Sequence, residues 1–126
     1  MVAADDKVVI GFMFSGGEKH DAPIGCELLE RIGRRKDSIY LLMDRAYEGY
    51  ETRYTAAMLG YHTVVPPKSN RIDPWDYDKE LYKKRNEVER CFRRYKRFRR
   101  VCTRYDKLDV MYLAFFTVAL IYEAVR

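Results

Sequence analysis

Four polar residues have the types and spacing of a site that handles phosphate esters. Tyr82, Arg85, Glu89 and Lys96 follow the pattern Y-x2-R-x3-E-x6-K. On an α-helix, where successive residues are about 100° apart, they lie at roughly 0°, 300°, 340° and 320°. They therefore predict a narrow stripe in which one carboxylate is bracketed by two cations and a phenol. Such a carboxylate is placed as a catalytic acid would be beside a phosphate-binding surface.

The charge around these residues supports a polyanionic partner. Lys79–Arg100 contains eleven Lys or Arg and three Glu, about +8, whereas the whole chain carries +5. On the same helical projection the stripe borders a cationic face, at roughly 0° to 120°. That face is formed by Lys83, Arg90, Arg93, Arg94, Arg97 and Arg100. Concentrated positive charge of this kind predicts nucleic-acid binding. The alternative is a basic surface helix in which Glu89 pairs with Arg85 and Arg93 at i±4.

A second acid, Asp44, directly follows the apolar run Ser38–Met43, which predicts a strand buried on both faces. Functional side chains gather at the carboxyl ends of parallel strands. Acids that meet there can share Mg²⁺, which takes oxygen ligands, and two such ions can clamp both oxygens of a phosphodiester. The alternative is that Asp44 caps the following turn.

The elements that position these residues predict an α/β domain with a mixed sheet, an initial hairpin and then parallel strands joined by helices. The predicted elements are a hairpin within 1–14, a helix from Pro23 to about Arg35, a strand over Ser38–Met43, a helix over Glu51–Leu59, a strand over Tyr61–Val65, a loop over Lys68–Asp78, a basic helix over about 79–97, and an apolar core helix over about 108–125. Within the loop, Trp75 either stacks on an extruded base or packs locally. Lys68 and Arg71 either touch DNA or are solvated.

The composition argues against several classes of protein. Three cysteines without C-x2-C spacing predict reduced thiols rather than a disulfide or zinc framework. The apolar run Val110–Tyr122 is too short to span a bilayer, so we expect no membrane partner and a cytoplasmic protein.

With these motifs assembled, the chain resembles the DDE transposases of bacterial insertion sequences, of the insertion-sequence four and five groups. The Tyr82, Arg85, Glu89 and Lys96 spacing matches their signature. Four further segments are similar to theirs: Gly17-Glu-Lys-His-Asp21, Leu41-Leu-Met-Asp-Arg-Ala-Tyr47, Val65-Pro-Pro-Lys-Ser-Asn-Arg71 and Arg104-Tyr-Asp-Lys107.

This resemblance implies a ribonuclease H-like domain over 1–126 that cuts and rejoins DNA with two Mg²⁺ or Mn²⁺ ions. Asp44 then matches the second catalytic and metal-binding acid, and Glu89 matches the third. Tyr82, Arg85 and Lys96 fall on positions that hold DNA phosphates. The expected partners are terminal inverted repeats and target DNA, and the expected location is the nucleoid. A second copy or a complementing N-terminal transposase fragment is a further expected partner.

The resemblance also implies a first catalytic Asp on a central strand, for which this sequence offers no match. Asp5 and Asp6 fall at the expected hairpin tip. We therefore expect an N-terminally truncated catalytic portion that is inactive alone. The alternative is a non-catalytic DNA-binding remnant that competes with the full-length enzyme.

Overall fold

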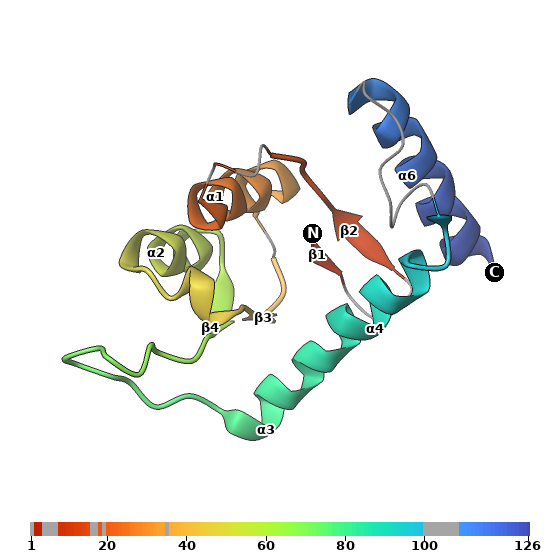
Figure 1. Cartoon of the computed structure of the whole chain (residues 1–126). Helices are drawn as coiled ribbons and strands as arrows, with labels where there is room; N and C mark the ends of the chain where they lie inside the picture. Colours follow the sequence, from red (N-terminus) through yellow and green to blue (C-terminus); the bar gives the residue numbers. More distant parts are fainter. Residues whose placement is uncertain (1, 4–7, 16–17, 19, 35, 100–108) are drawn as a thin grey trace. The chain divides into compact units, whose positions relative to one another are not determined.

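The computed structural model describes residues 2–3, 8–15, 18, 20–34, 36–99 and 109–126. The chain divides into two compact units. The central unit is Gly11–Arg85, and the terminal unit combines Met1–Ile10 with Asn86–Arg126. Figure 1 shows the helices and strands of both units, which together give mixed α/β content. Predicted features that lie outside the described residues include the turn at Asp5–Asp6, Arg100 of the cationic face and the segment Arg104–Lys107.

The central unit is built around two parallel strands. In chain order it contains α1 (Asp21–Ile32), β3 (Ile39–Leu42), the 3₁₀ helix η1 (Arg45–Tyr47), α2 (Tyr50–Met58), β4 (Tyr61–Val64), α3 (Lys79–Tyr82) and the 3₁₀ helix η2 (Lys83–Arg85). β3 and β4 pair with Ile39 opposite Tyr61 and Leu42 opposite Val64. In Figure 1, α2 lies beside both α1 and β4, as their contacts require.

A glycine with positive φ follows each of the helices α1 and α2, where the chain reverses direction. Gly33 takes φ 84° after α1, and its N–H bonds to the Leu29 carbonyl at 3.0 Å. Gly60 takes φ 86° after α2. Glycine adopts this region without a Cβ clash, so both helices stop and the chain enters β3 or β4. The core beneath them contains Leu29, Ala56 and Tyr61.

The terminal unit contains β1 (Val2–Ala3), β2 (Val9–Gly11), α4 (Asn86–Tyr95) and α6 (Asp109–Val125). β1 pairs with β2, as the predicted hairpin requires. α4 contacts both β1 and α6. Cys91, Tyr95 and Ala119 form the buried core between α4 and α6. Burial, together with the nearby Cys91 and Glu123, raises the pKa of Tyr95 to about 12.

The sheet differs from the predicted single mixed sheet. The described strands form two separate pairs, β1–β2 and β3–β4. β3 was predicted to be buried on both faces, yet Ile39 and Tyr40 at its start are exposed. Burial of both faces requires elements packed over both of them, and among the described strands β4 is the one that pairs with β3.

The segment predicted as one basic helix over about 79–97 is divided into α3, η2 and α4. The 3₁₀ turn falls on three successive cations, Lys83, Lys84 and Arg85. A 3₁₀ helix has about 3.0 residues per turn, so the α-helical projection that grouped Tyr82 and Arg85 with Glu89 does not hold across it.

α6 also differs from the predicted core helix. Its Phe116 and Ala119 are buried, whereas Val110, Val118, Ile121 and others are exposed. Among the described elements, α4 contacts the helix, and the buried cluster between them contains Cys91, Tyr95 and Ala119.

Candidate active site

Asp44 lies two residues after the end of β3, at the carboxyl end of the parallel pair. Its backbone is extended, and its carbonyl accepts the Tyr47 N–H at 2.9 Å to begin η1. Its side chain makes no capping hydrogen bond. The capping alternative for Asp44 is therefore not what the structure shows. The carboxylate is instead half exposed and available to groups around the strand end.

Arg85 and Tyr82 are the groups that lie near Asp44. An Arg85 guanidinium nitrogen is 3.8 Å from an Asp44 carboxylate oxygen, and the Arg85 side chain is 27% exposed. The same guanidinium lies 5.9 Å from the centre of the Tyr82 ring. Burial raises the pKa of Tyr82, with Arg85 opposing that rise and Asp44 adding to it. Helix α3 begins at Asp78, whose carboxylate accepts the Leu81 N–H at 2.9 Å and so fixes the start of this segment.

Tyr47 packs on the other side of the Asp44 turn, against α1. A Cβ on Gly25 of α1 would lie 2.7 Å from Tyr47 Cε1, so Gly25 allows the ring to approach the helix backbone. Burial raises the pKa of Tyr47, and the carboxylates of Asp21 and Asp44 raise it further. A glycine in a helix interior thus determines where the turn after Asp44 can lie.

Glu48 organises the loop that follows β4. The residue is buried, and one carboxylate oxygen accepts the Lys68 backbone N–H at 3.1 Å and the Arg71 guanidinium at 3.0 Å. The Lys68 ammonium lies 3.8 Å from the other oxygen. Burial alone would raise the pKa of Glu48, but the Lys68 N–H and Arg71 outweigh it and lower that pKa. Our sequence reasoning missed Glu48; its position four residues after Asp44 and beside a helix start was the available signal.

Trp75 has a packing role in this loop. Its indole N–H donates to the Val65 carbonyl at 2.9 Å. The guanidiniums of Arg53 and Arg71 lie 3.9 and 4.6 Å from the ring centre. Arg53 is itself held by the Glu48 carbonyl at 3.0 Å. The structure therefore favours the local-packing alternative for Trp75 over base stacking.

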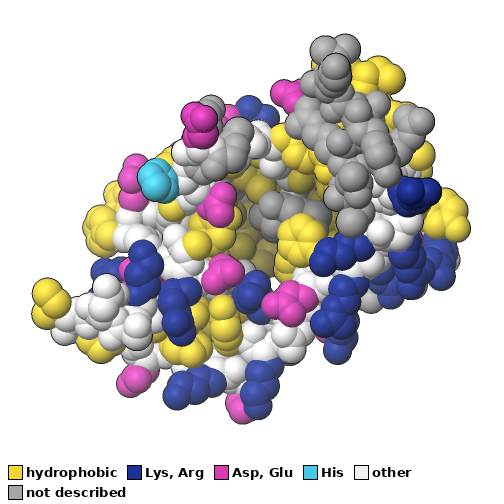
Figure 2. All heavy atoms as spheres, viewed as in Figure 1, with side chains coloured by type: hydrophobic (Ala, Val, Ile, Leu, Met, Phe, Trp, Pro, Cys, Tyr) yellow, Lys and Arg dark blue, Asp and Glu magenta, His cyan; other side chains and the backbone are white. Residues whose placement is uncertain are grey.

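α4 and the turn after it carry the remaining predicted site residues. Glu89 and Arg93 on the helix are exposed, as are Lys96 and Arg97 just beyond its end. Figure 2 shows Lys and Arg side chains gathered over α4. Arg94 differs, because its guanidinium lies 3.7 Å from the carboxylate of Glu123 on α6, which is 1% exposed. Arg126 lies 3.6 Å from the other oxygen of Glu123. Neither of these oxygens accepts a hydrogen bond within the described chain.

The predicted site residues thus fall into two groups. Asp44, Tyr82 and Arg85 meet within the central unit. Glu89 and Lys96 belong to the terminal unit, together with Arg93, Arg94 and Arg97.

Divalent-metal binding can be tested against these side chains. Within the described parts of the chain, no three His, Cys, Asp or Glu residues form a group that could hold an ion. In the central unit Asp44 supplies one carboxylate, and its nearest charged partner is a guanidinium, which competes with a cation for that carboxylate. These residues by themselves do not fit a two-metal centre.

No described helix has the length and apolar character needed to cross a membrane.

Comparison with known proteins identifies the family of this chain. Neither a curated protein nor a solved structure matches the chain. A protein family described as Transposase DDE domain matches residues 1–123, nearly the whole sequence. With Asp44, Arg85 and Tyr82 together at a strand end and a cationic helix following them, we conclude that the chain belongs to the Transposase DDE domain family.

Proposed function

We propose that this chain is the C-terminal catalytic portion of an insertion-sequence transposase, which cleaves and joins DNA at terminal inverted repeats. Asp44 and Glu89 act as the second and third acids, and Tyr82, Arg85 and Lys96 contact DNA phosphates. The observation that carries the proposal is the cluster of Asp44, Arg85 and Tyr82 at the carboxyl end of β3. Asp44 was predicted from the end of a strand, and Tyr82 and Arg85 were predicted from a helix further along the chain. The three residues meet at this position.

The chemistry of that cluster suits DNA ends. A guanidinium presents five N–H donors in a planar fork, which matches both carboxylates and phosphates. Arg85 beside Asp44 therefore places a phosphate-binding group next to an acid. Tyr82 is protonated at neutral pH, as an ordinary tyrosine is, and burial raises its pKa further, so its hydroxyl can donate to a phosphate oxygen.

α4 supplies the backbone-binding part of the proposal. Three cations along this segment are exposed: Arg93, Lys96 and Arg97. No Asp or Glu lies between Glu89 and Arg97 in the sequence to neutralise them. Contacts of this kind bind DNA irrespective of sequence and weaken as salt rises.

The first acid, in this proposal, comes from a strand that pairs with the open edge of β3. Ile39 and Tyr40 of β3 are exposed, and β4 is the one partner of β3 among the described strands. Added there, the strand would complete a ribonuclease H-like sheet and bring its Asp beside Asp44. Two Mg²⁺ or Mn²⁺ ions are the cofactors of the completed site, and the chain alone is expected to be inactive.

A complementation experiment tests the proposal. The coding DNA next to this sequence is read in every frame for a strand that ends in Asp, and that segment is co-expressed with the chain. We expect cleavage of duplexes that carry the ends of the genetic element, in the presence of Mg²⁺ or Mn²⁺. Asp44→Asn and Glu89→Gln should each abolish it, while Asp37→Asn, an exposed carboxylate elsewhere, should not. Cleavage that survives either substitution would refute the assignment of the acids.

A second candidate function is non-catalytic DNA binding that competes with a complete transposase. It is favoured by one observation, that the described residues hold no group of three potential metal ligands. On this alternative the chain binds duplex DNA in a salt-dependent way and inhibits the complete enzyme. Asp44→Asn and Glu89→Gln would then leave both properties unchanged.

A further inference from the structure

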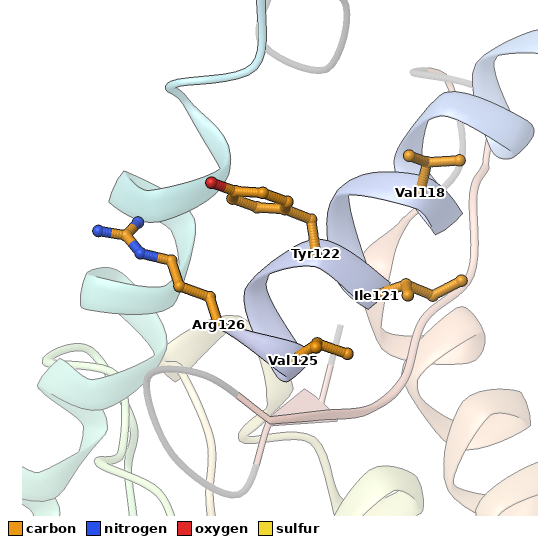
Figure 3. A pocket seen from close by; sticks show the side chains of 5 residues that line it. All are labelled: Val118, Ile121, Tyr122, Val125 and Arg126. Carbon is orange, nitrogen blue, oxygen red and sulfur yellow. The ribbon is translucent and has the colours of Figure 1, made fainter.

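A hollow on α6 and the start of α3 are two places where a further functional residue could lie. The hollow has a volume of about 630 Å³ and is lined by Val118, Ile121, Tyr122, Val125 and Arg126 (Figure 3). Its one charged lining residue, Arg126, lies 3.6 Å from Glu123. The start of α3, in contrast, leads directly to Tyr82 and Arg85 of the strand-end cluster.

Two side chains hold the first turn of α3 in place. The Asp78 carboxylate caps the helix by accepting the Leu81 N–H at 2.9 Å. Tyr77, the residue before this cap, packs its ring against that of Tyr82, with ring centroids 5.6 Å apart and ring planes at 79°. Tyr77 and Tyr82 thus occupy the position before the cap and the fourth position after it, whose contact is known as a hydrophobic staple. A staple fixes the angle at which the chain enters a helix.

α3 needs this support because it is a single turn. It contains four residues, Lys79–Tyr82, and passes directly into the 3₁₀ helix η2. Isolated helices of this length do not form in water, since their few hydrogen bonds do not offset the cost of ordering the backbone. The direction of Tyr82 and Arg85 within the central unit therefore depends on side-chain contacts at the start of the segment.

We propose that Tyr77 is a positioning residue, which holds the Tyr82 ring and, through it, the Arg85 guanidinium beside Asp44. The Arg85 guanidinium lies 5.9 Å from the centre of the Tyr82 ring and 3.8 Å from the Asp44 carboxylate. Tyr82 therefore connects Tyr77 to the cation of the strand-end cluster. This role rests on the proposed function, in which Tyr82 and Arg85 contact DNA phosphates.

The aromatic type of both residues suits this role. Edge-to-face packing of two rings fixes orientation as well as distance, because the positive edge of one ring is attracted to the negative face of the other. Burial is the largest cause of the raised pKa of Tyr82, and the neighbouring Tyr77 phenol is among the smaller causes. Tyr77 is itself half-buried, so its ring is one of the groups that keep water from Tyr82.

Titration of Tyr82 in variants of Tyr77 tests the proposal without DNA. In NMR of ring-labelled tyrosine, Tyr77→Ala should shift the pKa of Tyr82 down toward the ordinary tyrosine value near 10, because it exposes the Tyr82 ring. Tyr77→Phe keeps the ring contact and should retain most of the elevation. Tyr50→Ala is the matched control, since Tyr50 is an exposed tyrosine of the same unit, and it should leave the pKa of Tyr82 unchanged. An unchanged Tyr82 pKa in Tyr77→Ala, or an equal fall in Tyr77→Phe, would overturn the proposal.

DNA binding measures whether Tyr77 acts through Arg85. With a labelled duplex at fixed salt, Tyr77→Ala should weaken binding about tenfold, the scale of one lost hydrogen bond to a charged group, and Tyr77→Phe should bind as the parent does. In an Arg85→Ala background, Tyr77→Ala should cause no further loss. Equal losses in both backgrounds would mean that Tyr77 acts independently of Arg85 and has no positioning role.

Two controls separate this role from folding and from the proposed function. Circular dichroism shows whether Tyr77→Ala is folded. If it is not, Tyr77→Leu keeps an apolar staple without the ring, and it should also lower the pKa of Tyr82 and weaken DNA binding; parent values in a folded Tyr77→Leu would contradict the role of the ring. Absence of duplex binding by the parent chain would contradict the proposed function, whereas the Tyr82 titration would still decide the role of Tyr77.

Discussion

Arg93 and Arg94 are neighbours in α4, yet the structure predicts different consequences when each is replaced by alanine. Arg93 is exposed, while Arg94 is 25% exposed and lies 3.7 Å from the buried carboxylate of Glu123. Arg93→Ala should therefore weaken DNA binding and leave stability within about 0.5 kcal/mol of the parent. Arg94→Ala should chiefly reduce stability.

The size of the Arg93 effect follows from counterion release. Losing one phosphate contact makes the slope of log K against log salt shallower by about 0.9, which over a fourfold rise in salt is a difference of about 3.5-fold. Fluorescence anisotropy with a labelled duplex at several salt concentrations measures this slope. An unchanged slope would contradict a phosphate contact by Arg93.

The size of the Arg94 effect follows from what remains beside Glu123. Arg126, at 3.6 Å, is then the remaining cation beside this carboxylate among the described residues, and the carboxylate is 1% exposed. Loss of a partner from a buried charged group costs about 1–3 kcal/mol, which lowers Tm by roughly 4–12 °C. Adding Glu123→Gln to Arg94→Ala should recover part of this loss, because the charge that lacks a partner is removed. Equal melting temperatures for Arg93→Ala and Arg94→Ala would refute the reasoning.

Three other predictions concern the central unit. Gly25→Ala should destabilise it by about 1 kcal/mol in thermal unfolding, because overpacking against Tyr47 exceeds the gain in helix propensity. Glu48 has a lowered pKa, so its stabilising contribution is present above its ordinary value near 4.5 and is lost as pH falls through the lower folded value. Glu48→Gln should therefore flatten the acid limb of the stability profile. Asp44→Asn should lower the pKa of Tyr82, measured by NMR of ring-labelled tyrosine, because Asp44 contributes to its rise.

Each of the three predictions for the central unit would be contradicted by a specific result. Gly25→Ala with unchanged or higher stability would show that the Tyr47 ring moves aside freely. An acid limb that is equally steep without Glu48 would assign acid unfolding to other carboxylates. An unchanged Tyr82 titration in Asp44→Asn would mean that the two groups do not interact in solution.

The elements that were predictable from sequence are those with strong local signals. Gly60 ends α2 one residue from the predicted end, because only a residue without Cβ enters the left-handed region easily. β4 begins at Tyr61 as predicted, since its β-branched and aromatic residues favour extended backbone. The position of Asp44 after β3 followed from the same reasoning, as the apolar run ends there.

What could not be predicted depends on contacts between distant segments. Periodicity predicts an uninterrupted helix through Lys83–Arg85, because a change from α to 3₁₀ geometry leaves no mark in the hydrophobic pattern. The burial of Glu48 requires the loop that contains Lys68 and Arg71 to fold back over it, twenty or more residues away. The apolar sequence of α6 likewise shows that the helix needs cover and cannot show which face receives it within the chain.

Trp75 is the single tryptophan of the sequence, and its surroundings make it an optical reporter. Its ring lies beneath two guanidiniums, and its N–H is bonded to the Val65 carbonyl, so its emission depends on the loop after β4. Arg71 connects that ring to Glu48, which means that acid titration of one carboxylate should alter the fluorescence. Unfolding followed by tryptophan emission would thus monitor the central unit alone, while circular dichroism would average over both units. A difference between the two curves would separate their stabilities without a label or a truncation.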